Sequence, residues 1–409
     1  MMTKHLPIAL FVLALFSYST SHAAHQKQQT VSPKVHKVLT AAQTLSQQKQ
    51  YKKSLQTLNS LDESKLSGFE KSQLWNFKGF TYYEQEQYKK AIHALNKSLE
   101  YTKLSENIRL NTLQTIAHTH FTIEQYQQAI NVATQYIKID NQKKPQIFIL
   151  KAQAHYQLKQ YQSAIKDINH SIVIKNKTGK KINENDLLIL SACHQELEQY
   201  PQQIQTLKKL VQLYPKKMYF LALAGAFYET GDTKRQLSLY ETLYEKQWLN
   251  DPQQLKNLAQ LYILNDAPYK AANILEQAFT EKKIKRSINN LNLLARAWYA
   301  ARTPEKAIKP LIEAAGKTKN GRQYMKLGYL LSQMERWDDA IHAFSNAKKK
   351  GGLAKKNNVE LLTGIACFHA GHMQKAKKAF KKAINQQHYA SSAKTWLNVL
   401  NQYEMTVIN

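Results

Sequence analysis

WNFKGFTYYEQEQYKKAIHALNKS, residues 75–98, and YMKLGYLLSQMERWDDAIHAFSNA, residues 324–347, are two copies of one pattern. Each copy begins with an aromatic residue, places Gly between larger residues, and later places Ala between a second aromatic residue and further apolar ones. Large apolar residues at spacings of three, four and seven give a helix one apolar stripe, and a small residue lets two helices approach closely. Each stretch therefore predicts a pair of packed α-helices.

The pattern recurs along nearly the whole chain. Its copies align on the second small position, at Ser54, Ala91, Ala129, Ala164, Gln203, Gln236, Ala271, Ala307, Ala340 and Ala376. Subtraction gives steps of 37, 38, 35, 39, 33, 35, 36, 33 and 36 residues, close to the period of about 34 of a helix-turn-helix repeat. A single pair cannot bury its apolar stripe, so the pairs must stack on one another.

The repeated positions resemble the tetratricopeptide repeat over roughly residues 35–390. We therefore expect an all-α fold of about ten helix pairs, and the resemblance implies a right-handed superhelix, or α-solenoid. The stretch from Ser392 to Tyr403 has an amphipathic pattern with Trp396, Leu397 and Leu400 on one side. It predicts a capping helix at residues 391–405, because a stacked array needs a modified end.

Two polar segments interrupt the period. Residues 175–181 read KNKTGKK and residues 348–352 read KKKGG. Charged residues beside Gly predict enlarged loops. The period resumes after each segment, so neither is interpreted as a domain boundary.

The N-terminus has the features of a secretory signal peptide. Lys4 precedes an apolar run from Leu6 to Phe16, and small residues lead to Ala23. This order is typical of a cleavable export signal, so we expect a signal peptide at 1–23, a flexible segment at 24–34 and a periplasmic protein. The apolar run is too short to span a bilayer comfortably, and no other long apolar segment follows.

Catalytic and metal-binding motifs were not found in the sequence. Cys193 and Cys367 lie five repeats apart, too far for a disulfide, and are interpreted as buried thiols. His120, His155 and His194 share one repeat position, but neighbouring repeats place equivalent residues on the order of 10 Å apart, whereas zinc needs its ligands at about 2.1 Å. We therefore expect packing histidines, no cofactor and no enzyme.

The formal net charge is +29, and residues 281–409 hold 24 Lys and Arg against 8 Asp and Glu. Such an excess attracts acidic protein segments, anionic lipids or polymers, although it also serves solubility and helix C-termini. Both interpretations stay open. Nucleic acid is disfavoured by the export signal and by the lack of a groove-reading motif. The cations expected to form one basic edge are Lys282, Lys283, Lys285, Arg286, Lys348, Lys349, Lys350, Lys355 and Lys356.

The first helix of each tetratricopeptide pair lines the concave face, which predicts a partner-binding groove. The twelfth repeat position is aromatic at Tyr83, Phe121, Tyr156, Tyr228, Tyr299 and Phe368. Rings of this kind suit an extended or helical peptide, or they pack against the next repeat; both interpretations stay open. Lys256, Arg296, Arg322 and Lys326 project onto the same face. They predict binding of an acidic segment, against the alternative of solvated charge.

The second half resembles a narrower family, the periplasmic repeat proteins encoded with TonB-ExbB-ExbD energy-transduction systems. The resemblance covers about residues 210–400 and is carried by residues 248–262, 267–272, 293–298, 350–353 and 393–397. It implies a non-enzymatic scaffold that binds the TonB-type transducer or its partners. The alternative is an envelope factor that binds an anionic polymer or lipid headgroups through the basic edge.

Overall fold

The computed structural model describes residues 30–408 apart from 102–103, 141–143 and 354–357. The described residues form helices and loops, without a β-strand. The predicted signal peptide, residues 24–29 of the predicted flexible segment, and Lys355 and Lys356 lie outside the described residues. The chain divides into two compact units, residues 1–181 and 182–409.

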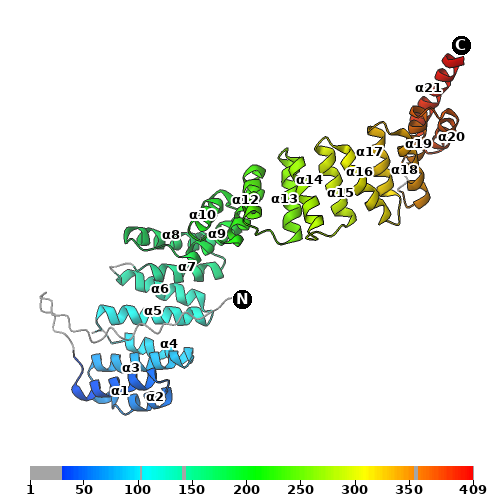
Figure 1. The fold of residues 1–409 in the computed structure, drawn as a ribbon. Coiled ribbons are helices and arrows are strands. Elements are labelled where there is room, and N and C mark those ends of the chain that lie inside the picture. The colour runs from blue at the N-terminus through cyan, green and yellow to red at the C-terminus, as the bar shows by residue number, and fades with distance from the viewer. Residues whose placement is uncertain (1–29, 102–103, 141–143, 354–357, 409) are drawn as a thin grey trace. The chain divides into compact units, whose positions relative to one another are not determined.

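Unit 1 contains four helix pairs, each made of two consecutive helices that pack on one another (Figure 1). Its helices are α1 (Pro33–Gln47), α2 (Tyr51–Asn59), α3 (Gly68–Glu84), α4 (Tyr88–Leu99), α5 (Glu106–Thr122), α6 (Tyr126–Ile139), α7 (Pro145–Gln157) and α8 (Tyr161–Lys177), with a 3₁₀ turn at Glu63–Lys65. Helix α8 continues through Lys177, so the predicted loop at 175–181 is shorter than expected. The division between the units falls directly after this loop.

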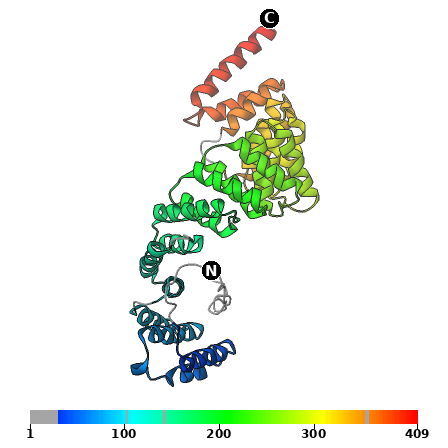
Figure 2. The same ribbon diagram turned by 90° about the vertical axis from the view of Figure 1, so that its left-hand side faces the viewer.

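Unit 2 contains six pairs and a final single helix, drawn in red in Figure 2. Its helices are α9 (Glu184–Glu196), α10 (Tyr200–Leu213), α11 (Lys217–Glu229), α12 (Thr233–Glu245), α13 (Pro252–Leu264), α14 (Pro268–Thr280), α15 (Ile288–Ala300), α16 (Pro304–Gly316), α17 (Arg322–Gln333), α18 (Trp337–Lys350), α19 (Val359–His369), α20 (Met373–Ile384) and α21 (Ala390–Ile408). Helix α21 packs on α19 and α20. The predicted all-α fold of ten pairs with a closing helix is confirmed.

The ten turns within the pairs share one backbone geometry. Each contains a residue with φ between 54° and 77°, five positions before the small anchor of the pattern. The following N–H donates to the carbonyl five residues earlier at 2.8–3.1 Å, which is the helix-ending Schellman arrangement. The ten residues are Lys49, Glu86, Glu124, Lys159, Glu198, Gly231, Asp266, Arg302, Glu335 and Gly371. The sequence period is therefore the period of this turn.

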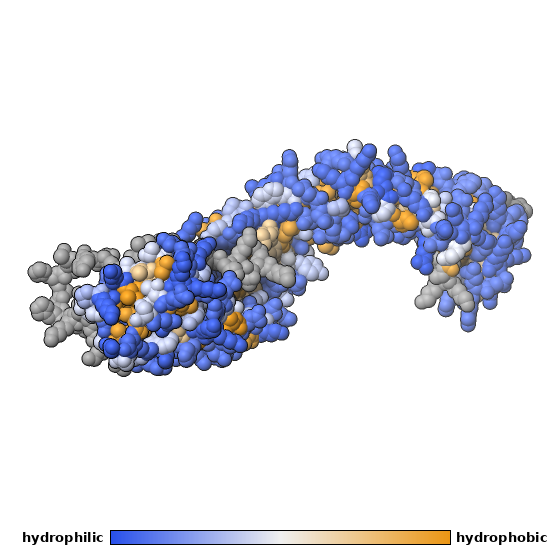
Figure 3. Space-filling view, turned by 90° about the horizontal axis from the view of Figure 1, so that it is seen from below, coloured by the Kyte–Doolittle hydropathy of each residue, from blue (hydrophilic) through white to orange (hydrophobic). Residues whose placement is uncertain are grey.

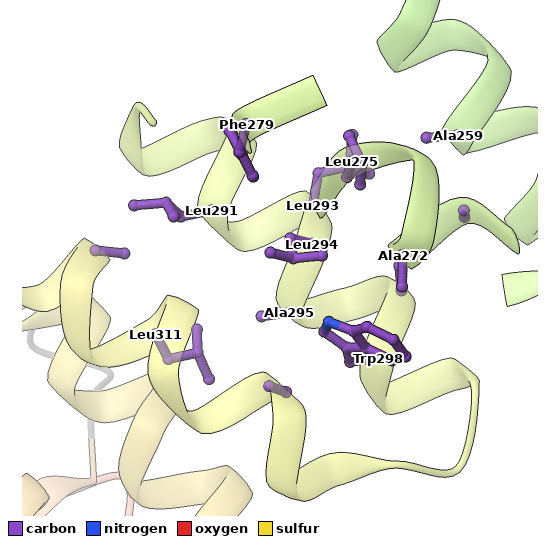
Figure 4. Close-up of a cluster of buried hydrophobic side chains, with 14 of the residues drawn as sticks. Ala259, Ala272, Leu275, Phe279, Leu291, Leu293, Leu294, Ala295, Trp298 and Leu311 are labelled. Carbon is purple, nitrogen blue, oxygen red and sulfur yellow. The ribbon is translucent and has the colours of Figure 1, made fainter. Parts of the chain in front are cut away.

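Apolar residues between the helices form the core. Nine of the ten small anchors are buried and Gln236 is half-buried. In unit 2, Leu275, Leu294 and Trp298 extend from α14 and α15 into one apolar cluster (Figure 4). At Gly328 a Cβ would lie 2.4 Å from the ring of Phe344, so this position holds α17 close to α18. A larger residue at position 328 would overlap the ring of Phe344, so the crossing of these two helices needs the small residue that the sequence predicted.

Candidate partner-binding site

The first helices of three consecutive pairs in unit 2 line a hollow of about 670 Å³. Helices α13, α15 and α17 supply most of its wall, and α16 supplies Ala307 and Leu311. The lining residues are Gln253, Lys256, Gln260, Asn289, Asn290, Asn292, Leu293, Ala295, Arg296, Tyr299, Ala307, Leu311, Lys326, Tyr329, Leu330 and Gln333. This volume lies in the range of sites that enclose a small ligand or a short segment of chain.

Four of the predicted groove residues, Lys256, Arg296, Tyr299 and Lys326, meet in this hollow. They lie on three helices because the repeat steps of 36 and 33 residues return the chain to nearly the same positions of the next pair. Lys256 and Asn292 occupy equivalent positions, and Lys326 lies one residue past that position on α17. Arg296 lies one helical turn beyond Asn292 along α15.

The hollow is cationic. No Asp or Glu occurs among its lining residues, and the structure records no ion pair of Lys256, Arg296 or Lys326 with a carboxylate of the described chain. Lys326 Nζ instead donates to Asn292 Oδ1 at 3.3 Å. Charged groups that lack a protein counter-ion in a concave, partly apolar site attract an anionic ligand.

The rest of the wall combines apolar and amide groups. Leu293 and Leu330 are buried at its base, whereas Tyr299 and Tyr329 remain 47% and 44% exposed. Tyr329 packs edge-on against Phe344 and donates its hydroxyl to Asn358 Oδ1 at 3.1 Å. The Asn and Gln side chains around the rim can donate to and accept from a peptide backbone. Such a surface suits an extended acidic segment that also carries apolar side chains.

Tyr329 and the amides of Asn289, Asn292 and Gln333 also line the hollow and were not predicted from the sequence. They occupy the concave positions of α15 and α17, at spacings of three, four and seven from the residues that were predicted. The repeat period that places Arg296 and Lys326 on the concave face places these four residues there as well, so their signal is position and not residue type.

In unit 1 the predicted groove rings pack within their own repeats. Each is half-buried and contacts the tyrosine that begins the second helix of its pair, five residues later. The pairs are Tyr83 with Tyr88 at 5.8 Å, Phe121 with Tyr126 at 5.4 Å, and Tyr156 with Tyr161 at 5.6 Å between ring centroids. The packing interpretation therefore describes these three rings.

The remaining predicted groove residues lie in unit 2, outside the hollow. Tyr228 at the end of α11 is 67% exposed, and Arg322 is exposed at the start of α17. Phe368 is half-buried and contacts Trp396 and Tyr403 of α21 at 5.6 and 5.8 Å, so this ring attaches the closing helix.

The predicted basic edge is partly neutralised. Arg286 donates to both carboxylate oxygens of Glu313. Its Nε lies 2.9 Å from Oε2 and 3.0 Å from Oε1, and its Nη2 lies 2.5 Å from Oε2. Hydrogen bonding to Arg286 keeps the pKa of Glu313 below its ordinary value. Lys283 pairs with Glu281 at 2.7 Å, and Lys348 pairs with Glu360.

The position of the predicted loop at 348–352 also differs from the expectation. Lys348, Lys349 and Lys350 form the last turn of α18, and only Gly351 and Gly352 leave the helix. Lys282 and Lys285 lie between α14 and α15 as expected. The basic edge is therefore less available to a ligand than its composition suggested.

The three repeated histidines each form a hydrogen bond within their own turn, and His155 Nε2 also lies 3.5 Å from Asp167 Oδ2 of α8. Nδ1 of His120, His155 and His194 forms a hydrogen bond with the side-chain oxygen of the Gln five residues later, at 2.7, 2.6 and 2.9 Å. Across the described residues no three His, Cys, Asp or Glu side chains gather in a way suited to a metal ion. Cys193 and Cys367 are buried and free.

Among the described residues, no helix is both long enough and apolar enough to cross a bilayer.

Comparison with known proteins identifies the repeat. Residues 70–142, which span most of α3 to α6, match the family model of the tetratricopeptide repeat. The resemblance of the pattern to this repeat is thereby confirmed, and the turn and anchor positions recur from α1 to α20. None of the curated proteins matches the chain.

Several solved structures are similar in outline. A tetratricopeptide repeat protein from Parabacteroides merdae is 14% identical with a TM-score of 0.37, over 64% of this chain and 99% of that chain. The C-terminal part of a repeat protein from Cytophaga hutchinsonii is 20% identical with a TM-score of 0.37, over 59% and 96%. MamA from Desulfovibrio magneticus is 16% identical with a TM-score of 0.36, over 43% and 94%. Likeness at this level supports no transfer of function.

Proposed function

We propose that this protein is a non-enzymatic scaffold whose unit 2 holds an extended acidic segment of a partner protein in the α13–α15–α17 hollow. The observation that carries the proposal is the convergence of Lys256, Arg296 and Lys326 on a hollow that contains no carboxylate. The tetratricopeptide repeat is a protein-interaction fold, which supports a protein as the partner.

The carboxylates of the bound segment would meet these three cations, and Arg296 offers a planar fork that can bind two oxygens at once. Tyr299 and Tyr329 would cover apolar side chains of the segment, since a half-exposed ring supplies contact area at low entropic cost. The amides at the rim would bind its backbone.

We further propose that the protein works in the periplasm together with a TonB-type system. The signal-peptide pattern at residues 1–23 favours a periplasmic location, and the resemblance of residues 210–400 to repeat proteins of TonB-ExbB-ExbD systems favours a partner among those components. In that setting the protein would be an accessory subunit of a TonB-type energy-transduction or uptake system.

The test is affinity purification of the full-length protein from its own cell envelope, with identification of the captured proteins. The variant Arg296→Glu/Lys326→Glu places two negative charges in the hollow, so we expect it to lose the partner. The variant Lys285→Glu/Lys309→Glu makes the same change in net charge at exposed positions outside the hollow and serves as the control.

Unchanged recovery of every partner by the hollow variant would refute the proposed groove. Capture of a partner other than a TonB, ExbB or ExbD component, with loss in the hollow variant alone, would support the groove and reject the TonB assignment.

A further inference from the structure

Helix α20 carries a row of lysines on the side that faces away from the core. Its sequence is MQKAKKAFKKAI, and Ala376, Ala379, Phe380 and Ala383 are buried. Lys375, Lys378, Lys381 and Lys382 are exposed. The row spans about seven residues, or roughly 10 Å along the helix at 1.5 Å per residue.

The rotation of α20 about its axis is fixed by Phe380. This ring is fully buried and stacks on Trp396 of α21 with 6.1 Å between centroids. On the other side it contacts α19, where a Cβ at Gly364 would lie 2.5 Å from the ring. Because Phe380 is held between two helices, the lysine row is held on the outside of the pair.

The carboxylates of this end of unit 2 are already engaged. From residue 337 to the C-terminus the sequence contains four, at Asp338, Asp339, Glu360 and Glu404. Asp338 pairs with His372 at 2.7 Å, Asp339 with Arg336 at 2.8 Å, Glu360 with Lys348, and Glu404 with Lys377 at 3.1 Å.

No carboxylate of this segment remains for the other described lysines, namely Lys349, Lys350, Lys375, Lys378, Lys381, Lys382 and Lys394. In Figure 3 the visible face of the right-hand end, where Figure 1 places α18–α21, is mostly hydrophilic, with a few neutral and apolar residues toward its inner side. Positive charge here greatly exceeds what the fold itself neutralises.

We propose that the lysine row of α20, Lys375, Lys378, Lys381 and Lys382, is a docking surface for an anionic phospholipid bilayer. This surface lies on other helices than the α13–α15–α17 hollow and does not depend on the function proposed for it.

The chemistry of the row favours a lipid surface over other polyanions. Arginine is absent from residue 337 onward, so the planar fork that suits specific carboxylate or nucleic-acid contacts is missing. Lysines are mobile point charges that attract hydrated headgroups without fixed geometry. A straight row on the outside of a helix can also approach a plane with all its charges together.

The test uses the full-length protein and sedimentation with vesicles made of equal parts of phosphatidylglycerol and phosphatidylcholine. We expect binding to these vesicles and none to pure phosphatidylcholine. The variant K375Q/K378Q/K381Q/K382Q should bind roughly 600-fold more weakly, because each lysine near an anionic surface contributes about five-fold to the affinity.

The matched control is K282Q/K283Q/K285Q/R286Q, which removes the same charge from the edge where Lys283 and Arg286 are already paired. It should retain most of the binding. Equal loss in both variants would show a response to net charge alone and overturn the proposal. A competition experiment offers the wild-type protein both the vesicles and a soluble polyanion. If the protein bound the polyanion and left the vesicles, the proposal would also be overturned. Circular dichroism of both variants establishes that they are folded.

Discussion

The aromatic ring at the twelfth repeat position has different surroundings at Phe121 of unit 1 and at Tyr299 of unit 2. In unit 1, Phe121 contacts Tyr126, the first residue of the second helix, at 5.4 Å. In unit 2, Tyr299 is followed five residues later by Pro304 instead of an aromatic residue, and remains 47% exposed. At these two positions the exposure of the ring follows the residue that begins the second helix, which is Tyr126 in one repeat and Pro304 in the other.

The polar residues of the first helices differ in the same way. In unit 1, Asn76 is buried and donates to Thr112 at 2.7 Å across two pairs. In unit 2 the equivalent positions of α13 and α15 hold Lys256 and Asn292, and Lys326 lies one residue past the equivalent position of α17. The two lysines find no carboxylate among the residues that line the hollow. Asn76 therefore finds its partner in the next repeat, whereas Lys256 and Lys326 leave positive charge available for binding.

The largest expected effect is on stability and compares removal of the ring of Phe121 with removal of the ring of Tyr299. Phe121→Ala removes a half-buried ring that packs against two apolar clusters, so we expect a loss of about 3 kcal/mol in the free energy of unfolding. Tyr299→Ala removes a half-exposed ring, and its effect should stay within about 0.5 kcal/mol. Urea unfolding followed by circular dichroism measures both.

Partner binding should show the opposite order. Tyr299→Ala is expected to weaken capture of the partner, and Phe121→Ala should leave it unchanged while unit 1 is folded. If both variants destabilised the protein equally, the proposed division between packing rings and binding rings would be wrong.

The second largest expected effect concerns the stability of unit 1 and depends on the buried carboxylate of Glu70. Buried Glu70 accepts hydrogen bonds from N–H and hydroxyl of both Ser32 and Ser67, at 2.7–2.9 Å, and so joins the starts of α1 and α3. Burial by itself raises the pKa of Glu70, but these four bonds outweigh it and lower the pKa from 4.5 to about 2. Because the pKa is depressed in the folded state, the stabilisation is complete above pH 4.5 and is lost as the pH falls toward 2.

Glu70→Gln should therefore cost on the order of 2 kcal/mol at neutral pH and flatten the acid dependence of unfolding below pH 4.5. The amide can accept at one atom only, and its NH₂ would face donors of Ser32 or Ser67. Glu106→Gln, at an exposed position in the first turn of α5, should change stability by less than about 0.5 kcal/mol. An unaltered acid-unfolding curve in the Glu70 variant would contradict this role.

The periodicity predicted the fold because each repeat uses the same turn, anchor and helix crossing. Ser54 and Gln203 could be placed as anchors although neither is Ala, since the step length identified them. The period also located Arg296 and Lys326, which project from fixed positions of a regular helix. Side-chain partners brought together from different pairs could not be predicted, because Glu70 with Ser32 and Arg286 with Glu313 depend on rotamers and on the packing between repeats.

A third prediction compares the shared turn with the helices that it joins. Gly231 has φ of 71° with open space around its Cβ position, and Gly225 lies within α11 with similar open space. Gly231→Ala should destabilise by about 1 kcal/mol, because the left-handed conformation is strained for Ala. Gly225→Ala should stabilise by about 0.5–1 kcal/mol, because Ala loses less entropy in a helix. Shifts of the same sign in the urea midpoint would show that the turn does not impose this conformation.

The smallest expected effect comes from converting the unit 2 arrangement into that of unit 1. Pro304→Tyr places at the first residue of α16 the ring that Tyr88, Tyr126 and Tyr161 supply in unit 1. The added ring should pack edge-on against Tyr299, a contact of about 0.5–1.5 kcal/mol, offset in part by the lost rigidity of Pro. The net change in stability should be small, but Tyr299 should become less accessible to nitration by tetranitromethane and less available to the partner. Pro268→Tyr is the control, because the residue five positions earlier there is Ile263 and Tyr299 lies in the next pair. If nitration of Tyr299 were as fast in the Pro304 variant as in the wild type, the residue at the start of the second helix would not be what distinguishes the two units.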